Sequence, residues 1–161
     1  MTKTRVFLGA GLGLMWSLLL LAGAAMFLPL PVFALIPTIM TAFLAPGLVM
    51  AFMVGRVAQR RFFEADAGMG PLSEAGEVDR RVLHNTTEQL VLAATIWPAA
   101  AVLLGPYGPG VIIALGVGFA LARLVYWAGC HRSGTQRVFG FAATFYPTVL
   151  VAIWAVGALV F

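Results

Sequence analysis

The sequence predicts an all-α protein that crosses a membrane as a helical bundle, and two observations support this prediction. Of the 161 residues, 61% are hydrophobic and only 10% are charged, with a mean hydropathy of +0.98. This composition cannot supply the polar surface of a soluble domain, whereas a bundle in lipid turns its apolar side chains outward. The apolar residues also form long continuous runs, which favours helices, because barrel strands would alternate apolar and polar positions in segments of about ten residues.

Five runs are long enough to cross a hydrocarbon core of about 30 Å as helices. Pro37 and Pro46 are expected to kink the second run, because proline removes a helical hydrogen bond. No internal repeat or second domain is visible, so residues 1–161 are interpreted as one transmembrane domain. The runs cover residues 6–28, 32–55, 79–104, 111–128 and 138–161.

The first run, residues 6–28, has an alternative interpretation as a signal peptide. Lys3 and Arg5 would suit its basic start, and residues 22–24 (Ala-Gly-Ala) resemble a small-residue cleavage site. The apolar run is long for a signal peptide, so a first spanning helix is preferred.

The placement of charge predicts the orientation of the bundle. If five helices cross the membrane in alternating directions, three basic segments lie on the same side of it: the N-terminus, residues 56–81 and residues 132–137. The connections on the opposite side, residues 29–31 and 105–110, carry no charge. By the positive-inside rule, the N-terminus and both basic loops are expected in the cytoplasm and the C-terminus outside.

Several function classes lack support in the sequence. The net charge of +4 is spread over helix ends without a dense patch, so nucleic acid is not an expected partner. Cys130 is the single cysteine, which excludes an internal disulfide, and no metal site is expected. There is no Gly-rich phosphate loop, His-Glu-x-x-His or Gly-x-Ser-x-Gly motif.

Two polar helical faces stand out in the apolar runs. Arg81, His84, Asn85 and Glu88 are spaced i, i+3, i+4 and i+7, so they share one face at the start of the third run. The fourth run carries a second such face, with the same helical spacing: Arg123, Tyr126 and Cys130. Where such faces meet, they would form a wet, arginine-rich pocket that suits a small anionic ligand.

A count from the cytoplasmic surface predicts how the two faces align. Glu88 and Arg123 both lie about 12 Å deep at a rise of 1.5 Å per residue, so an ion pair between them is expected. This pair could serve a ligand, or it could be a structural pair that fixes helix register. By the same count, Tyr126 lies opposite Asn85, and Cys130 lies opposite Arg81. Cys130 itself is expected to be a small packing residue. Four aromatic residues are expected to be interface anchors or packing groups: Trp97, Tyr107, Trp127 and Trp154.

In the spacing of these residues, the sequence resembles the MAPEG family, the membrane-associated proteins in eicosanoid and glutathione metabolism. The second helix of that family carries Arg-x-x-x-Asn-x-x-Glu, which Arg81, Asn85 and Glu88 match. Its next helix ends with Arg-x-x-Tyr before a basic loop, which Arg123 and Tyr126 match. The resemblance implies a bacterial-type member with a four-helix region over residues 32–161, and it makes residues 6–28 an extra N-terminal helix.

The resemblance also implies a function. It predicts a homotrimer of the bacterial inner membrane that uses glutathione as a co-substrate, in transfer to hydrophobic substrates or in peroxide reduction, by thiolate attack. Arg137 would act on the sulfur as the catalytic residue, because a nearby cation favours the thiolate. The other implied glutathione-binding residues are Arg81, Asn85, Glu88, Arg123 and Tyr126, with Arg56 or Arg60 supplied across a subunit interface.

The sequence also departs from one branch of that family. Gln89 and Cys130 stand where the leukotriene-forming branch usually has tyrosines. Two other functions stay open: a non-catalytic membrane protein of the same fold that binds lipids or acts as a scaffold, and a small transporter.

Overall fold

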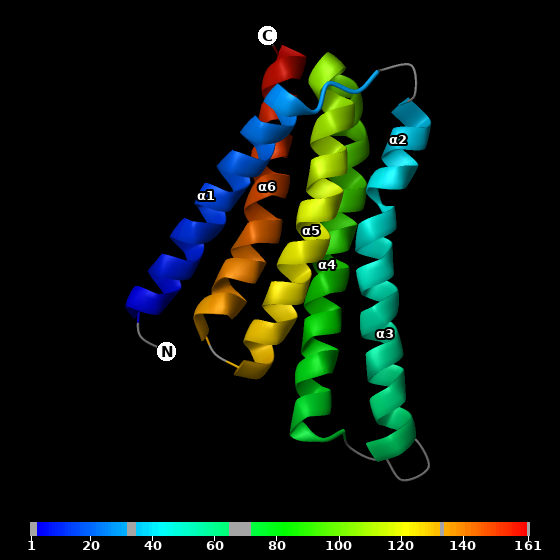
Figure 1. Ribbon diagram of the computed structural model, residues 1–161, viewed down its shortest axis with the longest axis vertical. Helices are drawn as coiled ribbons and strands as arrows, with labels where there is room; N and C mark the ends of the chain where they lie inside the picture. Colours follow the sequence, from blue (N-terminus) through cyan, green and yellow to red (C-terminus); the bar gives the residue numbers. More distant parts are fainter. Residues whose placement is uncertain (1–2, 32–34, 65–71, 133, 161) are drawn as a thin grey trace.

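The structure is a computed structural model, which describes residues 3–31, 35–64, 72–132 and 134–160 and contains only helices within those ranges (Figure 1). Five stretches there are long and apolar enough to span a membrane, with α2 and α3 counted as one. The predicted five-helix membrane bundle is confirmed. The elements are α1 (Lys3–Phe27), α2 (Leu35–Ala42), α3 (Leu44–Glu64), α4 (Glu74–Leu103), the short 3-10 helix η3 (Gly105–Tyr107), α5 (Gly108–Arg132) and α6 (Gly134–Val160).

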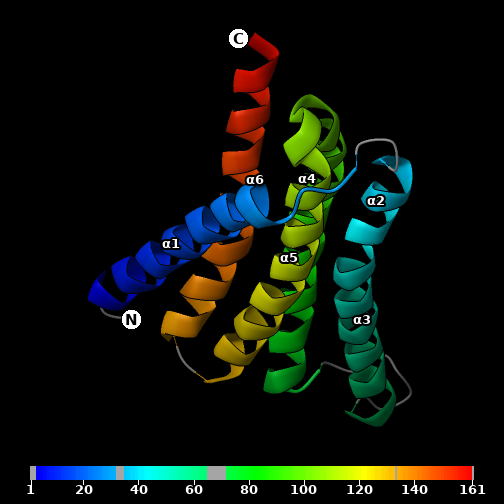
Figure 2. The ribbon, with the colours of Figure 1, turned by 45° about the horizontal axis from the view of Figure 1, so that its top comes forward.

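The spanning helices form a bundle in which α4 and α5 are central (Figure 1). The rod made by α2 and α3 lies on one side of this pair, and α6 lies on the other side with α1 inclined across it (Figure 2). The N-terminus and the α3–α4 and α5–α6 connections lie at one end of the bundle, which we call the basic end. The ends of α1, α4 and α6 and the starts of α2 and α5 lie at the opposite end.

The break between α2 and α3 falls at Phe43, three residues before Pro46. Proline has no N–H, and its ring crowds the carbonyl of the residue four positions earlier, which is Ala42. That carbonyl lies against α5 at Gly116, where an added side chain would overlap it. The predicted kink at Pro46 is therefore confirmed. Pro37 lies in the first turn of α2, where proline is tolerated, and the helix runs through it.

Two predicted helix boundaries were wrong near the basic end. The helix α4 begins at Glu74, five residues before the predicted start, because the Ser73 side chain caps it by accepting a hydrogen bond from the Gly76 amide at 3.2 Å. Similarly, α6 begins at Gly134, so Arg137 lies in the first turn of a helix and not in a loop. The connection between the second and third runs is therefore shorter than those runs predicted, and its residues 65–71 lie outside the described ranges.

The first helix packs closely along α6 through small residues. Gly9, Gly13 and Ser17 are buried on one face of α1. A Cβ added at Gly9 would lie 2.9 Å from the Val138 Cβ, and one at Gly13 would overlap Ala142. Close backbone approach through small residues is how membrane helices associate when the hydrophobic effect does not drive them together.

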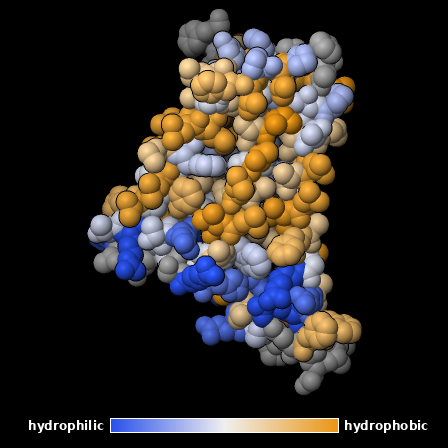
Figure 3. Space-filling view, viewed as in Figure 1, coloured by the Kyte–Doolittle hydropathy of each residue, from blue (hydrophilic) through white to orange (hydrophobic). Residues whose placement is uncertain are grey.

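The apolar core lies between α4, α5, α6 and the α2–α3 rod. Trp97 of α4 is 1% exposed, and its ring centroid lies 5.3 Å from that of Phe43 and 6.0 Å from that of Phe119. Its indole Nε1 donates a hydrogen bond to the Thr148 hydroxyl at 3.3 Å, which satisfies the only polar atom of the side chain. Trp97 is therefore a packing group, as expected. Large hydrophobic side chains also cover much of the outer surface, while polar side chains gather at the basic end (Figure 3).

Candidate functional site

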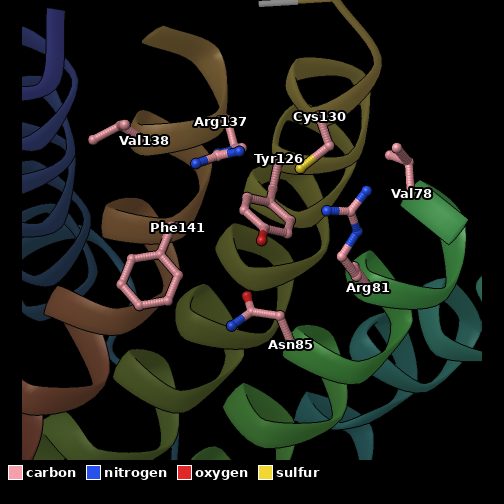
Figure 4. Close-up of a pocket in the computed structure, with 8 residues that line it drawn as sticks. All are labelled: Val78, Arg81, Asn85, Tyr126, Cys130, Arg137, Val138 and Phe141. Carbon is pink, nitrogen blue, oxygen red and sulfur yellow. The ribbon is translucent and has the colours of Figure 1, made fainter. Parts of the chain in front are cut away.

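A cavity of about 490 Å³ opens at the basic end between α4, α5 and α6 (Figure 4). Its walls combine two arginines, an amide, a phenol and a thiol with apolar side chains, and no carboxylate is among them. In Figure 4 the guanidinium groups of Arg81 and Arg137 lie on opposite sides of the Tyr126 ring. The lining residues are Val78, Arg81 and Asn85 of α4, Tyr126 and Cys130 of α5, and Arg137, Val138 and Phe141 of α6.

Two glycines bring α6 close enough to α5 to form this cavity. A Cβ at Gly140 would lie 2.6 Å from the Tyr126 Cα, and one at Gly129 would overlap the backbone nitrogen of Arg137. Because any larger residue would push the helices apart, these glycines hold the first turn of α6 beside Tyr126 and Cys130. Arg137 thereby reaches the cavity from a helix.

Arg123 lies on α5 about one turn before Tyr126, farther from the basic end, and is fully buried, with 0% exposure. One terminal nitrogen donates to Asn85 Oδ1 at 2.8 Å, and the other donates to the Thr144 hydroxyl. Its guanidinium carbon lies 4.7 Å from the centroid of the Tyr126 ring, a cation–π distance. Arg123 therefore contacts two of the residues that line the cavity, although it does not line the cavity itself.

The expected ion pair between Glu88 and Arg123 was wrong, because Asn85 lies between them. The Asn85 side-chain amide accepts from Arg123 through Oδ1 and donates to Glu88 Oε2 at 3.2 Å through Nδ2. Arg123 thus meets α4 one turn nearer the basic end than the depth count predicted. The Glu88 carboxylate is left 56% exposed, with the His84 Nε2 atom 3.4 Å away.

Glu88 lies in a second cavity of about 640 Å³ beside the first. Asn85 and Phe141 line both cavities, so they form the wall between them. The predicted site residues are therefore divided: Arg81, Asn85, Tyr126 and Arg137 line the first cavity, and Glu88 lines the second. The count of residues from the cytoplasmic surface therefore predicted the alignment of α4 with α5 to within about one helical turn.

Asp79 joins three helices behind the first cavity and is 3% exposed. Its Oδ1 atom accepts a hydrogen bond from the Trp127 Nε1 at 2.7 Å and lies 2.6 Å from the His131 Nε2. Its Oδ2 atom lies 2.5 Å from the Arg60 Nε and 3.8 Å from the Arg56 Nε. We call these five residues the Asp79 cluster. It fastens α3 and α5 to the part of α4 that carries Val78 and Arg81.

Arg56 and Arg60 therefore have contacts within their own chain. Neither lines the first cavity. Arg60 is 14% exposed against Asp79, whereas Arg56 is 38% exposed, donates to the Gln59 side chain at 2.8 Å and borders a surface hollow of about 420 Å³. That either arginine reaches a ligand in a neighbouring subunit stays a prediction.

The sequence interpretation missed two features of the site. Cys130 was expected to be a packing residue, yet it lines the cavity, although the depth count had placed it opposite Arg81. Asp79 was assigned to the helix start, yet it is the centre of a buried cluster. The signal for that cluster was His131, which is nearly level with Asp79 in the same count, together with Trp127 one helical turn before it.

The fold and the cavity define a class of protein: a helical integral membrane bundle with a basic cavity near one end of its spanning helices. The model of the MAPEG family matches residues 34–157, which is most of the chain. The chain therefore belongs to the MAPEG family. The match begins after α1, and no curated protein and no solved structure matches the chain.

Proposed function

We propose that the first cavity binds glutathione, or a closely related small anionic thiol, and that the protein uses the thiolate on hydrophobic substrates. One observation carries the proposal: in the described part of the chain, the residues that line the cavity supply two guanidinium groups, an amide and a phenol, and no carboxylate. Arginines bind carboxylates through paired, charge-assisted hydrogen bonds, so such a lining selects an anion.

The charges of glutathione fit the two adjoining cavities. Its two carboxylates suit Arg81 and Arg137, and its ammonium group suits the exposed carboxylate of Glu88 in the second cavity. Because Arg123 holds the oxygen of the Asn85 amide, the NH₂ group of that amide is left to face Glu88 and the ligand. The wall between the cavities thus presents donors to the anionic parts of the ligand.

Arg137 is the proposed catalytic residue, because a cation near the sulfur lowers the thiol pKa of bound glutathione. The thiol loses its proton, and the sulfur then bonds to an electrophilic carbon while the leaving group departs with its electron pair. With a peroxide, the thiolate attacks one peroxide oxygen, the O–O bond breaks and the other oxygen leaves as an alcohol once protonated. A second thiol then displaces water from the resulting sulfenic acid and gives a disulfide. Val138 and Phe141 give the cavity an apolar wall on α6, which suits hydrophobic substrates that arrive from the bilayer.

A homotrimer is part of this proposal. Glu88 and His84 are 56% and 80% exposed on α4, and Glu88 lies about 21 Å of helical rise after the start of α4 at the basic end. A carboxylate facing lipid at that depth is costly, so a second copy of the chain would cover this face. Arg56 is better placed than Arg60 to reach across such an interface, since it is the more exposed of the two. We also propose that the basic end faces the cytoplasm of a bacterial cell.

Calorimetry with a panel of thiols tests the binding site. Arg81→Ala should weaken glutathione binding at least tenfold while the trimer persists, because a hydrogen-bonded charge contributes about 1.5–3 kcal/mol. The matched control is Arg80→Ala, since Arg80 is the next residue, pairs with Glu77 at 2.8 Å and does not line the cavity. Absence of thiol binding by the wild type would refute the proposal and favour a non-catalytic lipid-binding or scaffolding protein.

A further inference from the structure

A groove of about 390 Å³ lies between α1 and α6 and is separate from the two cavities described above. Its floor is formed by Trp16 and Phe139, whose ring centroids lie 6.5 Å apart at an angle of 74°. The walls are apolar except for two polar side chains in the first turn of α6. The lining residues are Leu12, Met15, Trp16 and Leu19 of α1 and Thr135, Gln136 and Phe139 of α6.

This groove leads toward exposed cations at the basic end. Leu12, Trp16 and Leu19 follow Arg5 by 7, 11 and 14 residues, so Arg5 lies on the same face of α1, about two turns nearer the end than Leu12. Gly9, the next turn after Arg5, lies against Thr135 of α6. At the basic end, the groove therefore lies between the α1 turns that follow Arg5 and the first turn of α6.

Arg132, the last residue of α5, stands two residues before α6 begins, and both Arg132 and Arg5 are exposed. Nothing in the nearby sequence neutralises them. The six acidic residues all fall within residues 64–88, so α1, α5 and α6 contain none. The end of the groove is therefore a local excess of positive charge next to an apolar channel.

We propose that this groove binds an anionic phospholipid, with one acyl chain along Leu12 to Leu19 and the headgroup phosphate between Arg5 and Arg132. The spacing fits a lipid of one leaflet. At 1.5 Å per residue, the groove begins about 10 Å along α1 from Arg5 and ends about 21 Å from it, which is about the thickness of one leaflet with its headgroups, half of roughly 40–45 Å. The site gives a role to α1, which lies outside the family match.

Native mass spectrometry of the detergent-solubilised protein tests this site with phosphatidylglycerol and phosphatidylcholine of identical acyl chains. The wild type should prefer phosphatidylglycerol, by about fivefold for each arginine. The double variant Arg5→Gln/Arg132→Gln should bind both lipids within about twofold of each other. Leu12→Trp should weaken the binding of both lipids, because it fills the groove while leaving the cations in place.

The matched control is Arg61→Gln/Arg80→Gln, which removes the same charge from the ends of α3 and α4, on the other side of the bundle from α1 (Figure 1). It should keep the wild-type preference. Equal binding of the two lipids by the wild type, an equal loss of preference in the control, or unchanged phosphatidylglycerol binding by Leu12→Trp would overturn the proposal.

Discussion

At the scale of single residues, Arg123 determines the orientation of the Asn85 side-chain amide in the cavity wall. It is a fully buried cation, and its hydrogen-bond partners are neutral: Asn85 and Thr144. A buried charge without an opposite charge is costly, so its hydrogen bonds and the Tyr126 ring must offset desolvation. In return, Arg123 fixes which end of the Asn85 amide points toward Glu88. Arg123 is thus a positioning residue for the cavity.

This role predicts that Asn85→Asp separates stability from ligand binding. An aspartate can still accept from Arg123 and forms an ion pair with it, which offsets the repulsion between its other oxygen and the Glu88 carboxylate, so the melting temperature in detergent should stay about level. It cannot donate to Glu88 or to a ligand, and it places a negative charge in the cavity wall. Glutathione binding should therefore fall at least tenfold by calorimetry. A variant that melts early, or that binds glutathione normally, would contradict the orientation of the amide.

At the scale of helices, the Asp79 cluster holds the basic end of the bundle together. One carboxylate receives contacts from α3 and α5, and it lies on the same turns of α4 as Val78 and Arg81. The cluster therefore fixes the spacing of α4 and α5, on which the width of the cavity depends.

Asp79→Ala should destabilise the protein by about 3 kcal/mol or more in a reversible unfolding assay, because it removes the buried carboxylate that Arg60, Trp127 and His131 contact. Glu77→Gln is the control, since it breaks a pair with Arg80 whose side chains are 39% and 58% exposed. Such exposed pairs contribute about 0.2–1 kcal/mol. Equal losses in the two variants would show that the cluster does not fasten the helices.

At the scale of the whole molecule, the sequence was sufficient for the number and order of the spanning helices, because apolar runs of this length have few alternatives in lipid. The site was predictable in part. Helical spacing identified Arg81, Asn85 and Tyr126, since one helix determines its own faces. The Glu88 contacts could not be predicted, because they depend on a relative rotation and shift of packed helices of about one turn, and the sequence signal for the Asp79 cluster was limited to the level of His131. Those shifts are set by contacts such as Gly140 on Tyr126.

The orientation of the bundle follows from the charges at the basic end and can be checked by labelling. In a Cys130→Ser background, an impermeant thiol reagent added to intact cells should label Tyr107→Cys but not Gln136→Cys. Both positions are exposed in the structure and lie at opposite ends of the bundle. Labelling of Gln136→Cys under these conditions would reverse the proposed orientation.

The central claim is that the first cavity holds a thiol as its thiolate, and the ultraviolet thiolate absorbance of bound glutathione tests it most directly. The wild-type protein saturated with glutathione should show this absorbance at neutral pH. Arg137→Ala should raise the pKa of the bound thiol and lower the absorbance, while the dissociation constant changes less, because Arg81 and Asn85 remain. Equal absorbance in the variant and the wild type at neutral pH would contradict the assignment of Arg137 and the proposed use of the cavity.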